Sequence, residues 1–449
     1  MSDENQGTAV GRRQFAKLSA SALGLSAFGS GVVAAASTER FIVKRRGKKP
    51  IDAEVLHDLP EIGYAVVRGS EKELRRSKAV KEFVPDVELQ IGEPVEAVEP
   101  DDSEALDDAL YAYQWDKQDL EVPTAHGTTK GDGTRLAIID SGVDASHPDL
   151  KVNVDDSVNF TGDGLGAGVP GGGDHGTHVA GIAAAATEGP EGVAGTAPET
   201  DLLDFRVFSE FGGINGAFSS IVAAVVEAVR KDCDVANLSL GAYPIPRERL
   251  GSFYGGVLNK TMNYAKKEGT LVVAAAGNDA SDLQHDGGVI SLPNEAAGVL
   301  SIAATGPIGF ANELLGGAVR DPAETPASYT NYGTNAVDLA APGGNYDLSL
   351  TDPVGGVPAF AYDLVFSTVT TVVTDDEGNY IGSVPTYGWK AGTSMAAPNV
   401  AGAAALVKSA NPDYNPNQVR SALKNAADVP DAYGKEYYGS GYLNIVDAL

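Results

Sequence analysis

The chain has 449 residues, of which 43% are hydrophobic and 21% charged, and this composition, ordinary for a globular protein, argues against disorder throughout the chain. Its formal net charge is −28, because 61 Asp and Glu residues oppose 33 Lys and Arg residues. Nucleic acid is thereby excluded as a partner, since a phosphate-binding surface needs clustered Lys and Arg.

The acidic excess is distributed unevenly along the chain. Residues 1–106 carry a net charge of −3, whereas residues 107–449 carry −25. Self-repulsion of this size weakens a compact fold unless salt screens it. We therefore expect the second part to be adapted to molar salt, with an ordinary acidic mesophilic protein as the alternative.

The N-terminus has the features of an export signal. Arg12 and Arg13 precede a weakly apolar run of small residues, which ends in an A-x-A-like cleavage site at residues 34–36. The pattern predicts a Tat-type signal peptide over residues 1–36 and hence a secreted protein. Gly, Ser and Ala contribute too little transfer energy for a stable membrane anchor.

The next segment predicts a small α+β unit followed by a linker. Residues 40–47 and 62–69 have the apolar patterns of strands, and an amphipathic helix is expected near Glu71–Phe83. We place this unit at residues 37–92. The acidic, Pro-containing residues 93–110 predict an exposed linker that proteases can cut.

From residue 111 to residue 449, short apolar runs alternate with helical patterns. This alternation predicts a doubly wound α/β domain with a mostly parallel central sheet. The expected strands cover residues 135–140, 201–208, 235–240 and 271–277, and the expected helices residues 175–186, 218–231 and 257–269. The single cysteine, Cys233, allows no intramolecular disulfide and is expected beside the core.

Three polar residues fall where an open α/β sheet binds its ligands, beyond the carboxyl ends of the strands. Asp140 ends an apolar run, His175 opens a helix after a glycine-rich loop, and Ser394 opens another helix. A serine hydroxyl becomes a nucleophile when an imidazole takes its proton, and a carboxylate orients that imidazole. Asn278, after another strand, offers an amide donor for an oxyanion.

Each of these residues also has a simpler interpretation. Ser394 is alternatively a helix N-cap, which is the usual role of a serine at that position. His178, one helical turn after His175, is a rival general base.

Three ordered blocks, "AIIDSGVDASHPDL", "HGTHVAG" and "GTSMAAPNVAG", resemble the signature blocks of the subtilisin-like serine proteases, the subtilases or peptidase S8 family. "NLSLGAY" and "AAAGNDA" fall where that family keeps a substrate-binding strand and its oxyanion asparagine. "ASYTNYGTNAVDLAAPGG" resembles the segment ahead of the nucleophile. The resemblance extends from Gln114 to the C-terminus, and with the acidic charge it favours the halolysin-like type of halophilic archaea.

The resemblance implies a three-layer subtilisin-like fold and a role for each site residue. Asp140 would orient His175 as general base, Ser394 would be the nucleophile, and Asn278 would donate to the oxyanion beside the Ser394 amide. The residues implied for substrate binding are Ser239, Leu240, Gly241, Ala275, Ala276 and Gly277, together with Gly213 in a glycine-rich stretch that would pair with the substrate backbone.

The resemblance also implies partners and a processing step. Residues 37–92 would be a propeptide that assists folding, inhibits the enzyme and is removed by self-cleavage, with a plain N-terminal extension as the alternative. We expect polypeptide substrates, the chain's own propeptide as a partner, a monomer, and no organic cofactor.

A structural Ca²⁺ ion is expected from the same resemblance. Asp149 occupies the place of a family calcium ligand, and Glu188 in the loop "ATEGPEGVAG" would supply a further oxygen. Either residue is alternatively a solvated surface charge.

Two other functions remain open at this level. A catalytically silent subtilase-fold protein would bind or chaperone peptides without cutting them. An esterase is disfavoured, because residues 392–396 do not match G-x-S-x-G and the order Asp, His, Ser differs from that of the esterase fold. The segment between Pro342 and Ser394 is long and predicts a hairpin around Asp376–Asn379, which would flank the substrate cleft or decorate the surface.

Overall fold

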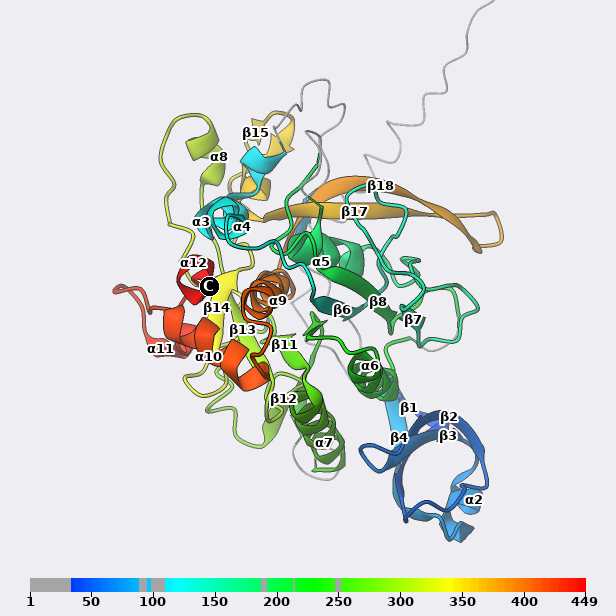
Figure 1. Cartoon of the computed structure of the whole chain (residues 1–449). Helices are drawn as coiled ribbons and strands as arrows, with labels where there is room; N and C mark the ends of the chain where they lie inside the picture. The colour runs from blue at the N-terminus through cyan, green and yellow to red at the C-terminus, as the bar shows by residue number, and fades with distance from the viewer. Residues whose placement is uncertain (1–33, 89–94, 98–109, 187–191, 213–214, 247–251) are drawn as a thin grey trace, which may run out of the picture.

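The computed structural model describes residues 34–88, 95–97, 110–186, 192–212, 215–246 and 252–449 (Figure 1). Most of the predicted signal peptide, and the predicted site residues Gly213 and Glu188, lie outside these ranges. Within the described residues, no helix combines the length and the apolar character needed to span a membrane.

A seven-stranded sheet forms the centre of the large domain, and all of its strand pairs are parallel. The strand order is β14-β13-β11-β9-β6-β8-β7. The strands are β6 (Arg135–Asp140), β7 (Val158–Asn159), β8 (Asp201–Arg206), β9 (Val235–Leu238), β11 (Leu271–Ala275), β13 (Leu300–Thr305) and β14 (Leu339–Pro342). The four predicted strands are confirmed.

Helices cover both faces of this sheet (Figure 1). Alternate residues of β6 enter different cores, because successive strand side chains point to opposite faces. Leu136 and Ile138 belong to the core under α5 (His175–Ala184) and α9 (Thr393–Ala410). Ala137 and Ile139 belong to the core under α6 (Phe218–Arg230) and α7 (Ser252–Glu268). The predicted three-layer α/β fold is therefore confirmed.

Shorter elements complete the large domain. Cys233 lies in the core beside α6 and β9 as expected, and burial raises the pKa of its thiol to about 12. The remaining helices are α3 (Trp115–Asp119), α4 (Val122–His126), α8 (Phe310–Leu314), α10 (Pro416–Ala426), α11 (Lys435–Tyr438) and α12 (Ile445–Ala448), with 3-10 turns at Tyr111–Tyr113 and Ala359–Asp363. Two small antiparallel pairs join β10 (Ala242–Pro246) to β12 (Val289–Leu292) and β15 (Pro353–Val354) to β16 (Val357–Pro358).

The N-terminal unit is a separate antiparallel sheet with the order β2-β3-β1-β4. Its elements are β1 (Ala34–Arg45), β2 (Glu54–Leu59), β3 (Tyr64–Arg68), α2 (Glu71–Arg76) and β4 (Val80–Glu88). One sheet face packs on α2 around Phe41 and Leu74. The other face joins the core of α6 and α7 through Ile42, Tyr64 and Val66. The unit therefore docks on the large domain, below α6 in Figure 1.

The prediction of a helix near Glu71–Phe83 is right for the first half of this range and wrong for the second half. Helix α2 ends at Arg76, where Ser77 takes an extended conformation, and Phe83 lies within β4. β4 pairs with β1 along much of its length, so tertiary strand pairing outweighs the local helical pattern.

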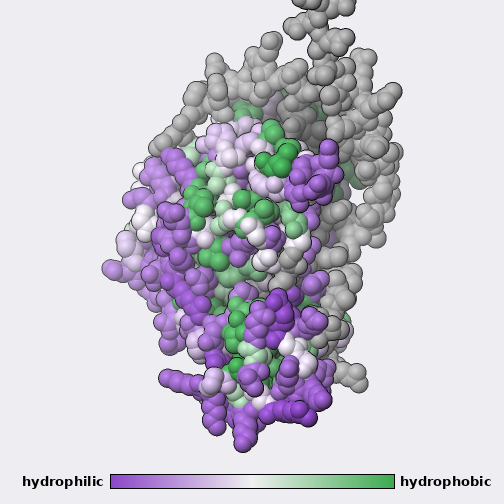
Figure 2. Space-filling view, turned by 90° about the vertical axis from the view of Figure 1, so that its right-hand side faces the viewer, coloured by the Kyte–Doolittle hydropathy of each residue, from purple (hydrophilic) through white to green (hydrophobic). Residues whose placement is uncertain are grey.

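A long hairpin projects from the large domain beside α5 (Figure 1). It consists of β17 (Val365–Thr374) and β18 (Tyr380–Ala391), so the predicted hairpin is confirmed. Three residues of the predicted linker form β5 (Val95–Ala97), which adds a third strand to it. Figure 2, which views the molecule from the side of the hairpin tip, shows hydrophilic residues around smaller apolar areas.

Candidate active site

The sheet and two helices bring three predicted residues to the same part of the molecule. Asp140 is the last residue of β6, His175 the first of α5, and Ser394 the second of α9. α5 and α9 pack against each other and against β6. Segments more than 200 residues apart in sequence are thus gathered by the parallel sheet.

Asp140 and His175 form a direct hydrogen bond. Nδ1 of His175 lies 2.7 Å from Oδ1 of Asp140, which is fully buried and also accepts from the backbone amide of Ser141. The carboxylate fixes the proton on Nδ1, which leaves Nε2 as a proton acceptor. Within the described part of the chain, Nε2 is buried and has no hydrogen-bond partner.

Two glycines permit the close packing around the end of β6. A Cβ atom on Gly176 would lie 2.5 Å from the carbonyl oxygen of Gly142. Gly142 has a φ of +108°, and a Cβ atom there would lie 2.3 Å from the carbonyl oxygen of Val169. A larger residue at Gly176 would therefore push α5 away from the end of β6, and one at Gly142 would displace the Val169 segment.

Ser394 is not the N-cap of its helix. The N-cap of α9 is Gly392, and the Ser394 hydroxyl donates to the carbonyl of Ser239 at 3.1 Å rather than accepting from a helix amide. Ser239 in turn donates its hydroxyl to the carbonyl of Ser394 at 2.7 Å. The N-cap interpretation of Ser394 is therefore wrong.

Asn278 presents its amide nitrogen near the backbone amide of Ser394. Its Oδ1 accepts from both the backbone N–H and the hydroxyl of Thr393, at 2.9 and 2.8 Å, which assigns Nδ2 to the other side. A Cβ atom placed on Gly392 would lie 3.3 Å from Asn278 Nδ2 and 3.6 Å from Ser394 N. Two donors thus converge on one small space beside Gly392, as the stabilisation of an oxyanion requires.

His178 lies in a different environment from His175. It is fully buried, and its Nε2 lies 3.1 Å from the Val365 carbonyl and 3.2 Å from the Gly388 carbonyl. Burial holds its pKa well below the ordinary value, with Lys390 as the next cause. His178 therefore joins α5 to the base of the β17–β18 hairpin, which argues against its role as the general base.

The predicted substrate-binding residues lie at the carboxyl ends of two neighbouring parallel strands, β9 and β11. β9 pairs with β11 so that Leu238 lies opposite Ala274. The residues that follow are Ser239, Leu240 and Gly241 on one side and Ala275, Ala276 and Gly277 on the other. A pocket of about 370 Å³ begins at the next residue after Gly277; it is lined by Asn278, Asp279, Ala280, Ser328, Tyr329 and Tyr346.

A buried ion pair holds the two helices of the site together, and the sequence analysis missed it. Lys117 is fully buried and donates to the Ile182 carbonyl of α5 at 2.9 Å and to the Asn399 amide oxygen of α9 at 2.5 Å. Its counter-ion is Asp116, 3.1 Å away. In the sequence "QWDKQD" resembles an exposed charged turn, so no local signal distinguishes this lysine from a surface one.

Asp149, the predicted calcium ligand, is held by hydrogen-bond donors in the structure. One oxygen of Asp149 accepts from the backbone amide of Val193 at 3.0 Å and from the hydroxyl of Tyr387 at 2.9 Å. No group of three or more His, Cys, Asp or Glu residues suited to a metal occurs among the described residues. A Ca²⁺ ion here would therefore depend on backbone carbonyls and on the loop that contains Glu188.

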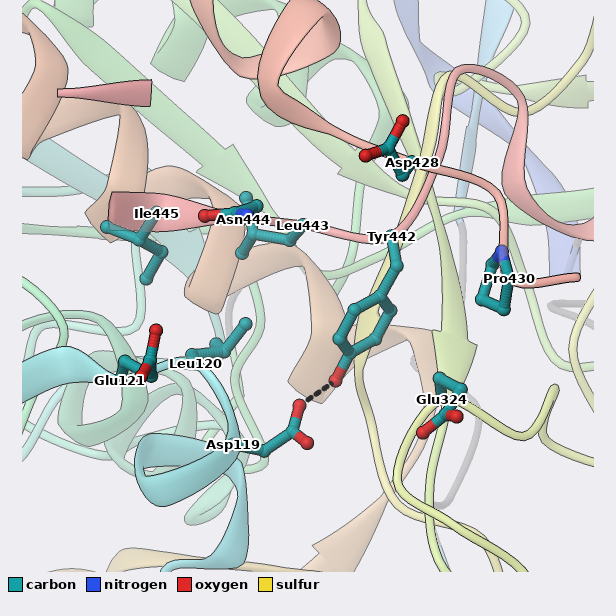
Figure 3. A pocket seen from close by; sticks show the side chains of 10 residues that line it. All are labelled: Asp119, Leu120, Glu121, Glu324, Asp428, Pro430, Tyr442, Leu443, Asn444 and Ile445. Atoms are coloured by element: carbon teal, nitrogen blue, oxygen red, sulfur yellow. Dashed lines mark hydrogen bonds between the residues drawn. The ribbon is translucent and has the colours of Figure 1, made fainter. Parts of the chain in front are cut away.

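A second pocket, of about 350 Å³, lies apart from these residues and shares none of them (Figure 3). The Tyr442 hydroxyl donates to Asp119 at 2.5 Å, and burial raises the pKa of Asp119 to about 6. The residues that line this pocket are Asp119, Leu120, Glu121, Glu324, Asp428, Pro430, Tyr442, Leu443, Asn444 and Ile445. Because it contains none of Asp140, His175, Ser394 and Asn278, this pocket is not the candidate active site.

Comparison with known proteins agrees with this geometry. Residues 131–441 match the model of the subtilase family, peptidase S8. The chain is 33% identical over 338 residues to Subtilisin Savinase of Lederbergia lenta, covering 74% of this chain and 96% of that protein. It is 29% identical over 402 residues to the halolysin-like extracellular serine protease Nep of Natrialba magadii, covering 87% and 62%.

Solved structures share the fold. The epidermin leader peptide processing serine protease of Staphylococcus aureus is similar with a TM-score of 0.67, covering 91% of this chain and 97% of that one at 22% identity. A lanthipeptide protease gives a TM-score of 0.58 at 27% identity, covering 77% and 95%. From the family match and these relatives, the chain belongs to the subtilases of peptidase family S8 and is a serine endopeptidase.

Proposed function

We propose that this enzyme is secreted and hydrolyses polypeptides through an acyl-enzyme, with Asp140, His175 and Ser394 as its catalytic residues. The observation that carries the proposal is the 2.7 Å hydrogen bond between buried Asp140 and His175, the first residue of α5, which packs against the helix α9 that carries Ser394 in its first turn. With Nδ1 bonded to Asp140, the other imidazole nitrogen, Nε2, is buried and has no hydrogen-bond partner among the described residues, so it can accept a proton.

In the proposed reaction, the Ser394 hydroxyl releases the Ser239 carbonyl and turns toward His175. Its oxygen attacks the substrate carbonyl carbon while Nε2 of His175 takes the proton. The oxyanion is stabilised by Asn278 Nδ2 and the Ser394 amide. His175 then protonates the departing amine, and water, deprotonated by His175, releases the acid and restores Ser394.

The N-terminal unit is proposed to be a propeptide that is removed by self-cleavage. Its docking on α6 and α7, and the antiparallel bridge between Glu88 and Ala217, support a role on the peptidase domain. The Tat route is supported by the twin arginines at positions 12 and 13. Adaptation to high salt is supported by the net charge and by the similarity to a halolysin-like protease.

A bound Ca²⁺ ion is proposed as a structural element near Asp149. Incubation with a chelator should lower the melting temperature of the Ser394→Ala chain by several degrees, and added Ca²⁺ should restore it. An Asp149→Asn variant should show a smaller response to the chelator. If the melting temperature is the same with chelator and with Ca²⁺, the ion is not part of the protein.

The central experiment compares the full-length chain with its Ser394→Ala variant after both are refolded in molar NaCl. The wild type should shorten by roughly the first hundred residues, as the unit and linker come off, while the variant stays whole. If both stay whole although folded, the catalytically silent alternative is favoured. If both shorten alike, the cleavage does not need Ser394, and the proposed self-processing by Ser394 is wrong.

A further inference from the structure

A short piece of the chain itself lies along the strand that leads to Ser394. β5 pairs antiparallel with the end of β18, with Val95 opposite Ala391, Glu96 opposite Lys390 and Ala97 opposite Trp389. The next residue after β18 is Gly392, which lies beside Asn278 Nδ2 and the Ser394 amide. The end of β18 is thus an edge on which an extended peptide is held close to the reacting groups.

The direction of β5 shows which part of a substrate this edge would hold. Val95 lies opposite Ala391, the strand residue closest in sequence to Ser394, and the later residues run away from it. A peptide bound in this direction places here the residues on the C-terminal side of its scissile bond. These residues belong to the leaving group of the acylation step.

Lys390 is the charged residue at this edge. Its side chain is 3% exposed, and Nζ lies 2.5 Å from Oε1 of Glu96 and 3.1 Å from Oδ2 of Asp174. Asp174 directly precedes His175 in the peptidase domain, so it stays beside Lys390 when a substrate binds. Glu96 belongs to β5, which occupies the place of the substrate. A lysine has three N–H donors, so one carboxylate leaves part of its capacity for the bound peptide.

We propose that Lys390 determines specificity by selecting an acidic side chain in the leaving-group half of the substrate, at the position opposite it in the strand pairing. This inference rests on the proposed peptidase function and adds a substrate class to it. A buried ammonium group pays a desolvation penalty that a carboxylate offsets and a neutral amide offsets less. A basic side chain at the same position would be repelled.

The test measures cleavage of peptides by the self-processed enzyme. The peptides differ only in carrying Glu, Gln or Lys at each of the first three positions after the scissile bond. At one of these positions we expect kcat/KM to be about five- to tenfold higher for Glu than for Gln, and lowest for Lys. Because this comparison uses the wild type, it does not depend on the folding of any variant.

Two variants and one control then assign the preference to Lys390. Lys390→Met should bring the Glu and Gln peptides to equal kcat/KM, and Lys390→Arg should keep most of the preference. Lys267→Met removes an equally charged side chain that is 78% exposed and paired with Glu268 on α7. It should leave the ratio unchanged.

The outcomes separate this inference from the proposed function. If the wild type cleaves Glu and Gln peptides equally at all three positions, the role of Lys390 is wrong and the peptidase function stands. If Lys390→Met slows all peptides alike and the ratio persists, Lys390 only positions its neighbour Asp174, which also overturns the inference. If the precursor does not process itself and no peptide is cleaved, both proposals fail together.

Discussion

Asp86 of the N-terminal unit caps helix α6 of the peptidase domain through Ser219. Its Oδ1 accepts from the Ser219 backbone amide at 3.1 Å, and its Oδ2 accepts from the Ser219 hydroxyl. The helix has no side-chain cap of its own, because Ala217 occupies its N-cap position. Asp86 is fully buried and also pairs with Arg40 of its own unit. One carboxylate therefore links the two parts of the precursor.

Replacing Asp86 by Ala should destabilise the precursor. Loss of a helix cap costs about 1–2 kcal/mol, and the substitution also removes the buried pair with Arg40. The Ser394→Ala chain that also carries Asp86→Ala should therefore melt at least several degrees lower. Calorimetry of the two chains measures the difference. Glu54→Ala, on the exposed edge of the same unit, is the matched control and should change little. Equal effects of the two substitutions would contradict a capping role.

Acid should loosen the contact between the two parts through His57. Its ring lies 6.0 Å, between centroids, from that of Phe160 in the peptidase domain. Burial, followed by the charges of Arg40 and Arg230, lowers the pKa of His57 to about 4. The docked state thus keeps His57 neutral, while a released unit protonates it near pH 6.5. Stability is unaffected above pH 6.5 and falls as the pH drops from 6.5 to 4.

This pH effect is measured on the Ser394→Ala chain, where catalysis plays no part. Its melting temperature should fall between pH 7 and pH 4.5 by more than that of a matched chain carrying His57→Gln. The difference corresponds to about 2 kcal/mol in the free energy of unfolding. Parallel pH profiles for the two chains would show that another group controls the contact.

The oxyanion assignment predicts a loss of turnover rather than of binding. Asn278→Asp keeps an acceptor for Thr393 and removes the amide donor, so the local fold should persist. We expect kcat to fall by about 10²–10³ with little change in KM. That range is the one recorded for a subtilisin, and we take it from the family rather than from the geometry. A rise in KM at unchanged kcat would place Asn278 in substrate binding instead.

The sequence predicted the central sheet well, because buried parallel strands are uninterrupted apolar runs and each run recurs as one strand. It also located Asp140, His175 and Ser394, which the structure brings to one region. It failed where long-range pairing decides. Val80–Glu88 and Val95–Ala97 are strands only because β1 and β18 accept them. Lys117 and Lys390 appear as surface charges in the sequence and are buried only by the packing of distant segments.

High salt should stabilise the peptidase domain. Residues 107–449 carry a net charge of −25, so their carboxylates repel one another at low ionic strength. At 1 M salt the screening length is about 3 Å, and this repulsion is largely screened. The melting temperature of the Ser394→Ala chain should therefore rise steadily between 0.1 and 3 M NaCl. Sucrose at equal osmolality is the control, since it stabilises proteins without screening charge.

Neutralising exposed carboxylates should reduce this salt dependence. Asp376, Asp413 and Asp431 are exposed and lie in different parts of the domain. Replacing all three by Asn should raise the melting temperature at 0.1 M NaCl and change it little at 3 M, because the repulsion they add is already screened there. Calorimetry at both concentrations measures the difference.

The NaCl series also separates the two explanations of the acidic charge. A melting temperature of the Ser394→Ala chain that does not rise with NaCl would favour the acidic mesophilic alternative, in which the charge serves solubility.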